Sequence, residues 1–290
     1  MKFNVEKYPE FIWKLAHGKS MSVGPVARIM AIVNVTPDSF SDGANYFLPK
    51  KAVAHAISSL KEGADIIDIG GESTRPGFIP ITAKQEQERI LPVIEELADR
   101  TDAIISVDTY HPETAKLSIR AGAHIINDVC GLQQGKNMAK IIAQYGAGVC
   151  IMHTGRGRKK LSDVFEDQYY FLEKSLKIAH DEGISRDAIV IDPGFGFAKE
   201  IQENFSLMAN VSKLRKFNLP ILVGISRKRF LGKMEQKDRS SDATTAAANC
   251  FLRIEGAAIF RVHNVSINRD SLRMMDTIIK TKNISSKERE

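Results

Sequence analysis

Polar side chains recur directly after short Ile- and Val-rich runs throughout this 290-residue sequence. We count eight such runs, and each is three to seven residues long. The polar residues at or just beyond their ends are Asn34, Asp68, Asp108, Asn127, His153, Asp192, Ser226 and, after the last run, Arg261 with His263. One or two such ends would be ordinary. Eight of them indicate a single pocket, provided that all the runs point the same way.

The types of these residues fall into two chemical groups. Asp108, Asn127 and Asp192 offer carboxylate oxygens and one amide. Carboxylates accept hydrogen bonds and an amide both donates and accepts, so this group suits a planar, nitrogen-rich heterocycle. Arg75 and Arg261 are cations that can hold phosphate oxygens in pairs.

His263 joins the phosphate-type group, and Asn34 adds a neutral oxygen beside it. With phosphates nearby, such an oxygen suits Mg²⁺, which takes few protein ligands and keeps its waters. Simpler interpretations remain open for several residues. Asp68 can be a structural acid and His153 a buried core histidine, and Lys228 by itself would also suit Schiff-base chemistry.

The elements that must position these groups follow a regular alternation. The apolar runs are Ile29–Val35, Ile66–Ile69, Ile104–Asp108, Ile125–Asn127, Val149–His153, Ile189–Asp192, Ile221–Ser226 and Ile259–Val262. Uninterrupted runs of this kind are typical of parallel strands buried on both faces. Amphipathic helical patterns separate them, as at Lys50–Glu62 and Thr82–Arg100.

This alternation predicts an α/β protein, a single (β/α)₈ TIM barrel over residues 29–281. An open doubly wound sheet is the alternative, but no G-x-G-x-x-G follows the first run. We expect residues 1–28 to be a leader that packs on the barrel, with a short helix near Pro9–Leu15. Residues 282–290 read as a polar C-terminal tail.

Composition narrows the possible partners. The net charge of +6 and the pI of about 9.1 suit an anionic small molecule. We expect no nucleic-acid role, because no basic run with interleaved aromatics appears. Three widely spaced cysteines argue against disulfides and zinc. The absence of a signal-like leader and of an 18-residue apolar stretch predicts a cytoplasmic protein without membrane contact.

Several longer motifs together resemble the dihydropteroate synthases, the pterin-barrel enzymes of folate biosynthesis. The first two span residues 34–43 (NVTPDSFSDG) and 68–77 (DIGGESTRPG). The others are SVDT at 106–109, INDV at 126–129, DPGFGF at 192–197, GISRK at 224–228 and RVH at 261–263. They occur in the family's order from about residue 29 to residue 265.

This resemblance implies the fold, a reaction and a set of roles. Para-aminobenzoate would displace diphosphate from 6-hydroxymethyl-7,8-dihydropterin diphosphate and give 7,8-dihydropteroate. The implied catalytic residues are Asp108, Lys228, Arg261 and His263. The pterin diphosphate would bind Thr74, Asp108, Asn127, Met152, Asp192, Phe197, Gly224, Lys228, Arg261 and His263. The aminobenzoate region would include Phe40, Thr74, Arg75, Pro76, Phe195 and Ser226. Asn34 would be the protein ligand of Mg²⁺, and the enzyme would be a homodimer.

Some positions depart from the family's pattern. Thr154 to Gly157 differ from the frequent Met-His-Met segment, and Ala198 replaces a frequent glycine, so the floor under the pterin is expected to differ. Two other functions are weighed. One is a methyltetrahydrofolate methyltransferase type of pterin barrel, which would lack the loops near Phe40 and Arg75. The other is a non-catalytic pterin-binding homologue, which would be expected to lose Asn34, Asp108, Lys228 or His263.

Overall fold

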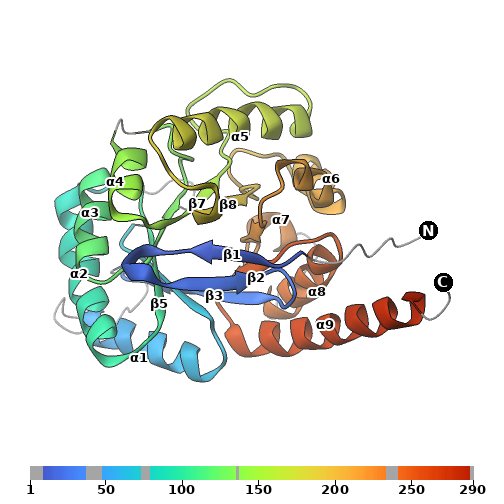
Figure 1. The fold of residues 1–290 in the computed structure, drawn as a ribbon, viewed down its shortest axis with the longest axis horizontal. Helices are drawn as coiled ribbons and strands as arrows, with labels where there is room; N and C mark the ends of the chain where they lie inside the picture. The colour runs from blue at the N-terminus through green and yellow to red at the C-terminus, as the bar shows by residue number, and fades with distance from the viewer. Residues whose placement is uncertain (1–8, 37–47, 73–78, 135–136, 233–240, 288–290) are drawn as a thin grey trace.

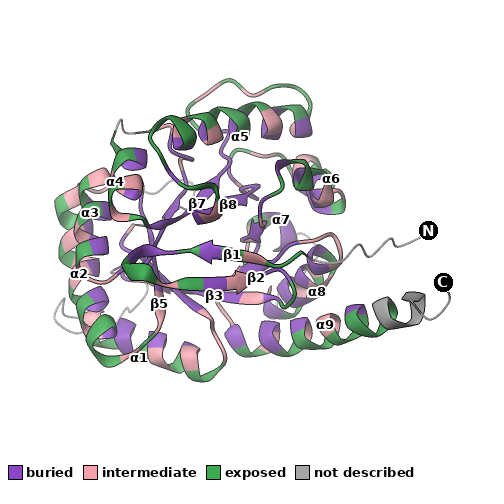
Figure 2. Ribbon diagram, viewed as in Figure 1, coloured by how far each residue is buried: buried purple, intermediate pink, exposed green. Residues whose placement is uncertain are grey.

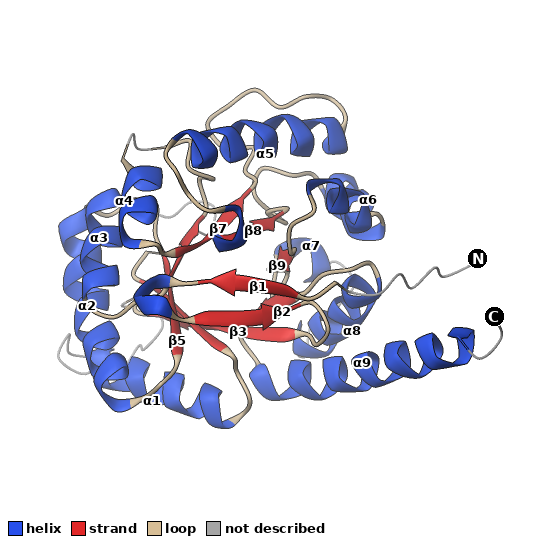
Figure 3. Ribbon diagram, viewed as in Figure 1, coloured by secondary structure: helices blue, strands red, loops and turns tan. Residues whose placement is uncertain are grey.

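The computed structural model describes residues 9–36, 48–72, 79–134, 137–232 and 241–287 of the chain. Within them, eight parallel strands follow one another around a ring, with helices on the outside (Figures 1 and 3). The strands are β3 (Arg28–Asn34), β4 (Ile66–Gly70), β5 (Ile104–Asp108), β6 (Ile125–Asp128), β7 (Gly148–Met152), β8 (Ile189–Asp192), β9 (Leu222–Val223) and β10 (Ile259–Val262).

The hydrogen-bonded order of this sheet is β8-β7-β6-β5-β4-β3-β10-β9. A parallel bridge between Ile191 and Ile221 joins the two ends, and the amide of Ile191 donates to the carbonyl of Pro220 at 3.0 Å. The sheet therefore closes on itself. The predicted (β/α)₈ barrel is confirmed.

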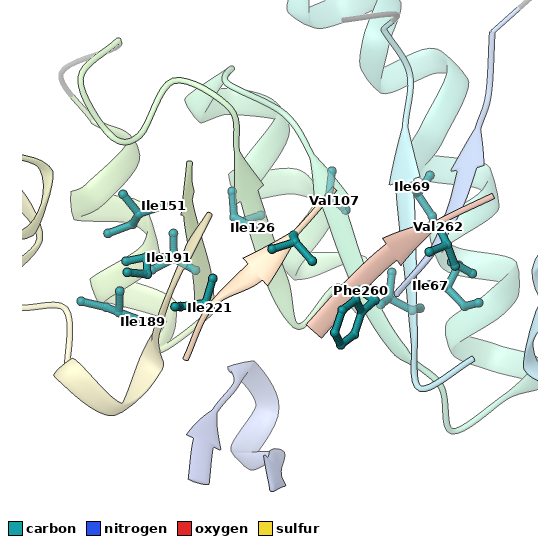
Figure 4. Close-up of a cluster of buried hydrophobic side chains, with 14 of the residues drawn as sticks. Ile67, Ile69, Val107, Ile126, Ile151, Ile189, Ile191, Ile221, Phe260 and Val262 are labelled. Carbon is teal, nitrogen blue, oxygen red and sulfur yellow. The ribbon is translucent and has the colours of Figure 1, made fainter. Parts of the chain in front are cut away.

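The helices cover the outer face of the strands and bury it. They are α1 (Leu48–Lys61), α2 (Ala83–Arg100), α3 (Pro112–Arg120), α4 (Met138–Tyr145), α5 (Val164–Asp181), α6 (Ile201–Ala209), α7 (Arg229–Gly232), α8 (Ser241–Ile254) and α9 (Val265–Lys287). Branched strand residues such as Ile67, Val107 and Ile126 form the layer beneath them (Figure 4). Along the helices, buried and exposed faces alternate as an amphipathic pattern requires (Figure 2).

The N-terminal leader is a β-hairpin, so the helix predicted near Pro9–Leu15 is wrong. Strand β1 (Phe11–Lys14) pairs antiparallel with β2 (Ser20–Val23). Burial in this segment alternates from one residue to the next, as in a strand. Trp13 is buried while its neighbours Ile12 and Lys14 are exposed.

This hairpin plugs the end of the barrel at which the strands begin. Trp13 packs in one buried cluster with Ile66, Ile125 and Ile259, which stand at or near the starts of their strands. Its indole N–H donates to the carbonyl of Ala188, just before β8, at 2.8 Å. The opposite end, where the strands finish, stays available for a site.

Other sequence-based bounds shift modestly. Strand β9 covers only Leu222–Val223 of the predicted run Ile221–Ser226. Helix α9 continues to Lys287, so it extends into the segment that we expected to be a tail. Among the described residues, no helix combines the length and the hydropathy needed to cross a membrane.

Candidate active site

A pocket that opens to solvent lies at the ends of the strands. Residues from β5, β6, β7, β8 and β10 line it, together with residues from the segments after β6, β8 and β9, and this is the end of a barrel where active sites form. Nine of the predicted site residues are among the lining: Asp108, Asn127, Met152, Asp192, Phe195, Phe197, Gly224, Lys228 and Arg261.

Arg261 lies between two carboxylates in this pocket. Its Nε donates to Oδ2 of Asp68 at 2.7 Å, and its Nη2 donates to Oδ2 of Asp108 at 2.7 Å. Burial disfavours the cation, but the two carboxylate charges outweigh that cost and raise the pKa of Arg261. The guanidinium is therefore a permanent positive charge.

Asp68 holds two pocket residues although it does not itself line the pocket. Its side chain is fully buried, and besides Arg261 its Oδ2 accepts from Nδ2 of Asn127 at 3.2 Å. Within the described residues its Oδ1 has no hydrogen-bond partner. From the sequence alone, a purely structural role for Asp68 was as plausible as a role in the site. The structure makes it the common partner of Asn127 and Arg261.

Burial shifts the pKa values of the other charged groups in the direction that favours their uncharged forms. It raises the pKa of Asp108 to about 7, against the opposing charge of Arg261. It raises the pKa of Asp192 to about 6, against the hydrogen bond that the Gly194 amide donates at 2.7 Å. Burial, with the nearby charge of Arg261, lowers the pKa of Lys228 to about 8. Such shifts concentrate at functional sites.

Phe197 forms the apolar floor of the pocket together with Val129 and Met152. Two cations lie over its ring: Lys228 Nζ at 4.4 Å and Arg156 Cζ at 4.3 Å from the ring centroid. Cation–π contacts of this kind are favourable where water is scarce. Arg156 belongs to the segment that departs from the family's pattern. One contact to the floor of the pocket therefore comes from a residue outside that pattern.

His263 and Ser226 form a pair beside the pocket. The Ser226 Oγ accepts from the His263 backbone amide at 3.2 Å and lies 2.9 Å from Nδ1 of the same residue. When the Ser226 hydroxyl donates to Nδ1, the ring hydrogen of His263 lies on Nε2.

Asn34 ends strand β3, in register with Gly70, which is in turn in register with Asp108. A Cβ on Gly70 would lie 3.8 Å from Asn34 Oδ1 and 3.5 Å from Asp108 Cβ, so both side chains border the space above this glycine. Asn34 is partly exposed at the site. The predicted residues Phe40, Thr74, Arg75 and Pro76 lie outside the described residues.

Sequence reasoning missed two lining residues, Val129 and Gly194. Both sit in motifs that were noted, so position after a strand end was the available signal. The structure places His153 as a buried residue hydrogen-bonded to Asp167 at 3.0 Å, and it does not line the pocket.

Comparison with known proteins gives a consistent result. The chain matches the family model described as "Pterin binding enzyme" over residues 30–263. It is 40% identical over 257 residues to a dihydropteroate synthase of Streptococcus pyogenes, covering 87% of this chain and 96% of that protein.

Two solved structures are similar over nearly their full length. One is a dihydropteroate synthase from Clostridium difficile in the presence of pteroic acid, with a TM-score of 0.83, 39% identity, and coverage of 87% of this chain and 97% of that chain. The other is the Xanthomonas albilineans enzyme with 4-aminobenzoic acid, with a TM-score of 0.85, 37% identity, and coverage of 91% and 97%. This chain belongs to the dihydropteroate synthase family of pterin-binding enzymes.

Proposed function

We propose that this chain condenses 6-hydroxymethyl-7,8-dihydropterin diphosphate with para-aminobenzoate, giving 7,8-dihydropteroate and diphosphate in folate biosynthesis. It is therefore a transferase. The observation that carries the proposal is one pocket in which Asp108, Asn127 and Asp192 lie with the cations Lys228 and Arg261. The related structures with pteroic acid and with 4-aminobenzoic acid support both substrates.

The carboxylates and the amide would hold the pterin ring. Asp192 and Asn127 offer oxygens to the ring N–H groups, and the amide of Asn127 also donates. Met152 and Phe197 supply an apolar surface against one face of the ring, and Gly224 leaves room because it has no side chain. Lys228 would donate to a ring acceptor while it carries its proton.

The cations would hold the diphosphate and stabilise it as it leaves. Arg261 adds a fixed positive charge, and His263 would donate its Nε2–H when Ser226 donates to its Nδ1. In the reaction the C–O bond of the pterin methylene breaks and diphosphate leaves with the electron pair. The arylamine nitrogen then forms the new C–N bond and loses a proton to solvent or diphosphate.

Asp108 would stabilise the positive charge that develops on the methylene as this bond breaks. Its carboxylate lies in the pocket beside Arg261, and it does so as an anion only above its raised pKa. The residues proposed for the aminobenzoate are Phe40, Thr74, Arg75, Pro76, Phe195 and Ser226. Phe195 is held in the wall by its stacking on Phe230, with ring centroids 6.2 Å apart.

The donor set at Asn34 fits Mg²⁺ if the protein supplies few of the ion's ligands. Among the described residues, no three His, Cys, Asp or Glu side chains gather as a metal site. A neutral oxygen at Asn34, completed by substrate phosphate oxygens and waters, matches the ion's preference for few protein ligands. When bound, Mg²⁺ would neutralise charge on the leaving diphosphate.

The remaining proposals concern assembly and compartment. We propose a homodimer formed through α8 and α9, which expose Phe251, Met274 and Ile278. We propose the cytoplasm as the compartment, in agreement with three cysteines that are all free. The substrates are small molecules, with no role for nucleic acid or membrane.

The deciding experiment mixes the protein with the pterin diphosphate, para-aminobenzoate and Mg²⁺, and follows dihydropteroate and diphosphate. Both products should appear together, and only when all three are present. Binding of both substrates without product would favour the non-catalytic homologue. Methyl transfer from methyltetrahydrofolate, with no dihydropteroate, would favour the methyltransferase type.

A further inference from the structure

Lys199 stands behind the pterin floor, between β8 and α6, and is tied to two neighbouring strand ends. Its Nζ donates to the carbonyl of Gly194 at 2.8 Å and lies 2.9 Å from Nδ1 of His153. Gly194 follows β8 and lines the pocket, while His153 follows directly on β7. One amine therefore joins the ends of two adjacent strands.

Both nitrogens of the His153 ring face charged groups. When the Lys199 ammonium donates to Nδ1 at 2.9 Å, the ring hydrogen lies on Nε2, which faces Asp167 Oδ2 at 3.0 Å and also has Arg158 Nη2 at 3.0 Å. Burial lowers the pKa of His153 to about 4, so the ring is neutral near pH 7. Arg158 donates to both oxygens of the Asp167 carboxylate, from Nη1 to Oδ1 at 2.8 Å and from Nη2 to Oδ2 at 2.6 Å. The cluster thus links β7, β8, α5 and the loop after β7.

The backbone that carries this cluster packs directly against the backbone that carries the pocket residues. A Cβ on Gly194 would lie 1.9 Å from the carbonyl oxygen of His153, so the two strand ends are in close backbone contact. The Gly194 amide donates to Asp192 at 2.7 Å, and Met152 immediately precedes His153. A shift of Gly194 or His153 would therefore move Asp192 or Met152, two residues proposed to hold the pterin.

We propose that Lys199 is a positioning residue for the pterin subsite, whose ammonium group fixes the Gly194 turn against the His153 ring. The inference rests on the proposed function, since it concerns the same pocket. Lys199 need not touch the substrate. It acts through Asp192 and Met152, and its charge makes both bonds stronger than a neutral amine would.

The groups around Lys199 make its charge sensitive to pH near neutrality. Burial is the largest influence and lowers the pKa of Lys199 to about 7. Asp192 from β8, Asp167 from α5 and Glu203 from α6 oppose this shift, while Lys160 adds to it.

His153, directly after β7, faces the amine through Nδ1, and Arg158 lies 3.0 Å from its Nε2 and pairs with Asp167. As the pH rises through about 7 the ammonium is lost, and the two bonds to Gly194 and His153 weaken.

The test compares Lys199→Met with the wild type by titration with pteroic acid at pH 6 and pH 8.5. Because a charge-assisted hydrogen bond is lost, the variant's Kd should be about tenfold higher at pH 6. The ratio of the two Kd values should shrink to a few-fold at pH 8.5. Titrations that both proteins share, such as those of Asp108 and Lys228, cancel in this ratio.

Lys160→Met is the matched control. Lys160 pairs with Glu203 at 2.7 Å, and the bonds of its ammonium go to neither Gly194 nor His153. Its Kd should stay within about twofold of the wild type. Circular dichroism confirms that each variant is folded at the temperature of the titration.

A second readout needs no ligand. The backbone amide resonance of Gly194 should shift strongly in Lys199→Met and little in Lys160→Met. Equal Kd values for Lys199→Met and wild type, a ratio that does not change with pH, or an unmoved Gly194 resonance would each overturn the assignment. A wild type that fails to bind pteroic acid would instead count against the proposed function, while the resonance would still report on Lys199.

Discussion

Asp108 and Asp192 differ in what surrounds them, although both are buried carboxylates at strand ends. Asp108 accepts a charged hydrogen bond from Arg261, whereas Asp192 accepts one from a backbone amide. In the proposed reaction, the first would stabilise the charge that develops on the methylene, and the second would hold the neutral pterin ring. The division of labour in the pocket therefore follows from the partner of each carboxylate.

Replacing Asp108 by Ala tests this division. We expect kcat to fall by about 100-fold or more, because an electrostatic partner of the developing charge is lost. The affinity for a pterin analogue should fall by less than about tenfold, since Asn127 and Asp192 remain. Steady-state kinetics beside calorimetric titration measures both, and near-normal turnover would sink the role given to Asp108.

The pH dependence of kcat/KM should be a narrow bell. Activity rises as Asp108 loses its proton near pH 7 and falls as Lys199 and then Lys228 lose theirs, near pH 7 and pH 8, following the pKa values that burial gives them. In Lys228→Arg, which stays charged, the part of the basic limb near pH 8 should move to higher pH even if the maximum drops. A flat profile between pH 6 and 9 in the wild type would contradict these assignments.

At the scale of elements, the strands could be predicted well and the hairpin could not. Runs such as Ile189–Asp192 indicate buried parallel strands because every position is apolar until the end. The hairpin strand Phe11–Lys14 has only four residues, too few for a period of two to stand out.

Some site residues, too, can be recognised in the sequence and others cannot. Asp108 and Asp192 are visible in sequence because each ends an apolar run. Lys199 is not, because its bonds go to a backbone carbonyl and to a histidine 46 residues away in sequence. The role of Asp68 also depends on contacts with distant strands, which only the closed barrel brings together.

The hairpin should carry a substantial part of the stability. Trp13 is fully buried against the starts of the strands, so Trp13→Ala should lower the free energy of unfolding by about 3–5 kcal/mol. Chemical denaturation followed by circular dichroism measures this. Trp13→Phe, which keeps an aromatic ring, should lose clearly less, and equal losses would contradict a packing role. The KM for the pterin should hardly change, since the plug lies at the far end.

At the scale of the whole molecule, the barrel separates stability from chemistry. The hairpin and the starts of the strands form one end, and the charged pocket forms the other. Helix α9 extends beyond the body of the barrel along its last turns (Figure 1). Its exposed Met274 and Ile278 give it an apolar surface that a second copy would cover.

The proposed dimer can be tested by charge. Met274→Lys should shift the molar mass in light scattering from dimer to monomer, because a buried unpaired charge opposes association. Tyr170→Lys, at a similarly exposed position on α5, should leave the dimer intact. A wild type that is monomeric at micromolar concentration would contradict the proposal, as would a dimer that Met274→Lys leaves unchanged.

The most direct test of the central claim follows one isotope. The pterin diphosphate is prepared with ¹⁸O in the oxygen that bridges the methylene and the phosphorus, and it is turned over with para-aminobenzoate and Mg²⁺. Mass spectrometry should find one unlabelled 7,8-dihydropteroate for each labelled diphosphate, because the C–O bond breaks at the methylene. Label retained in a hydroxymethyl pterin, with diphosphate released unlabelled, would show attack at phosphorus and contradict the account.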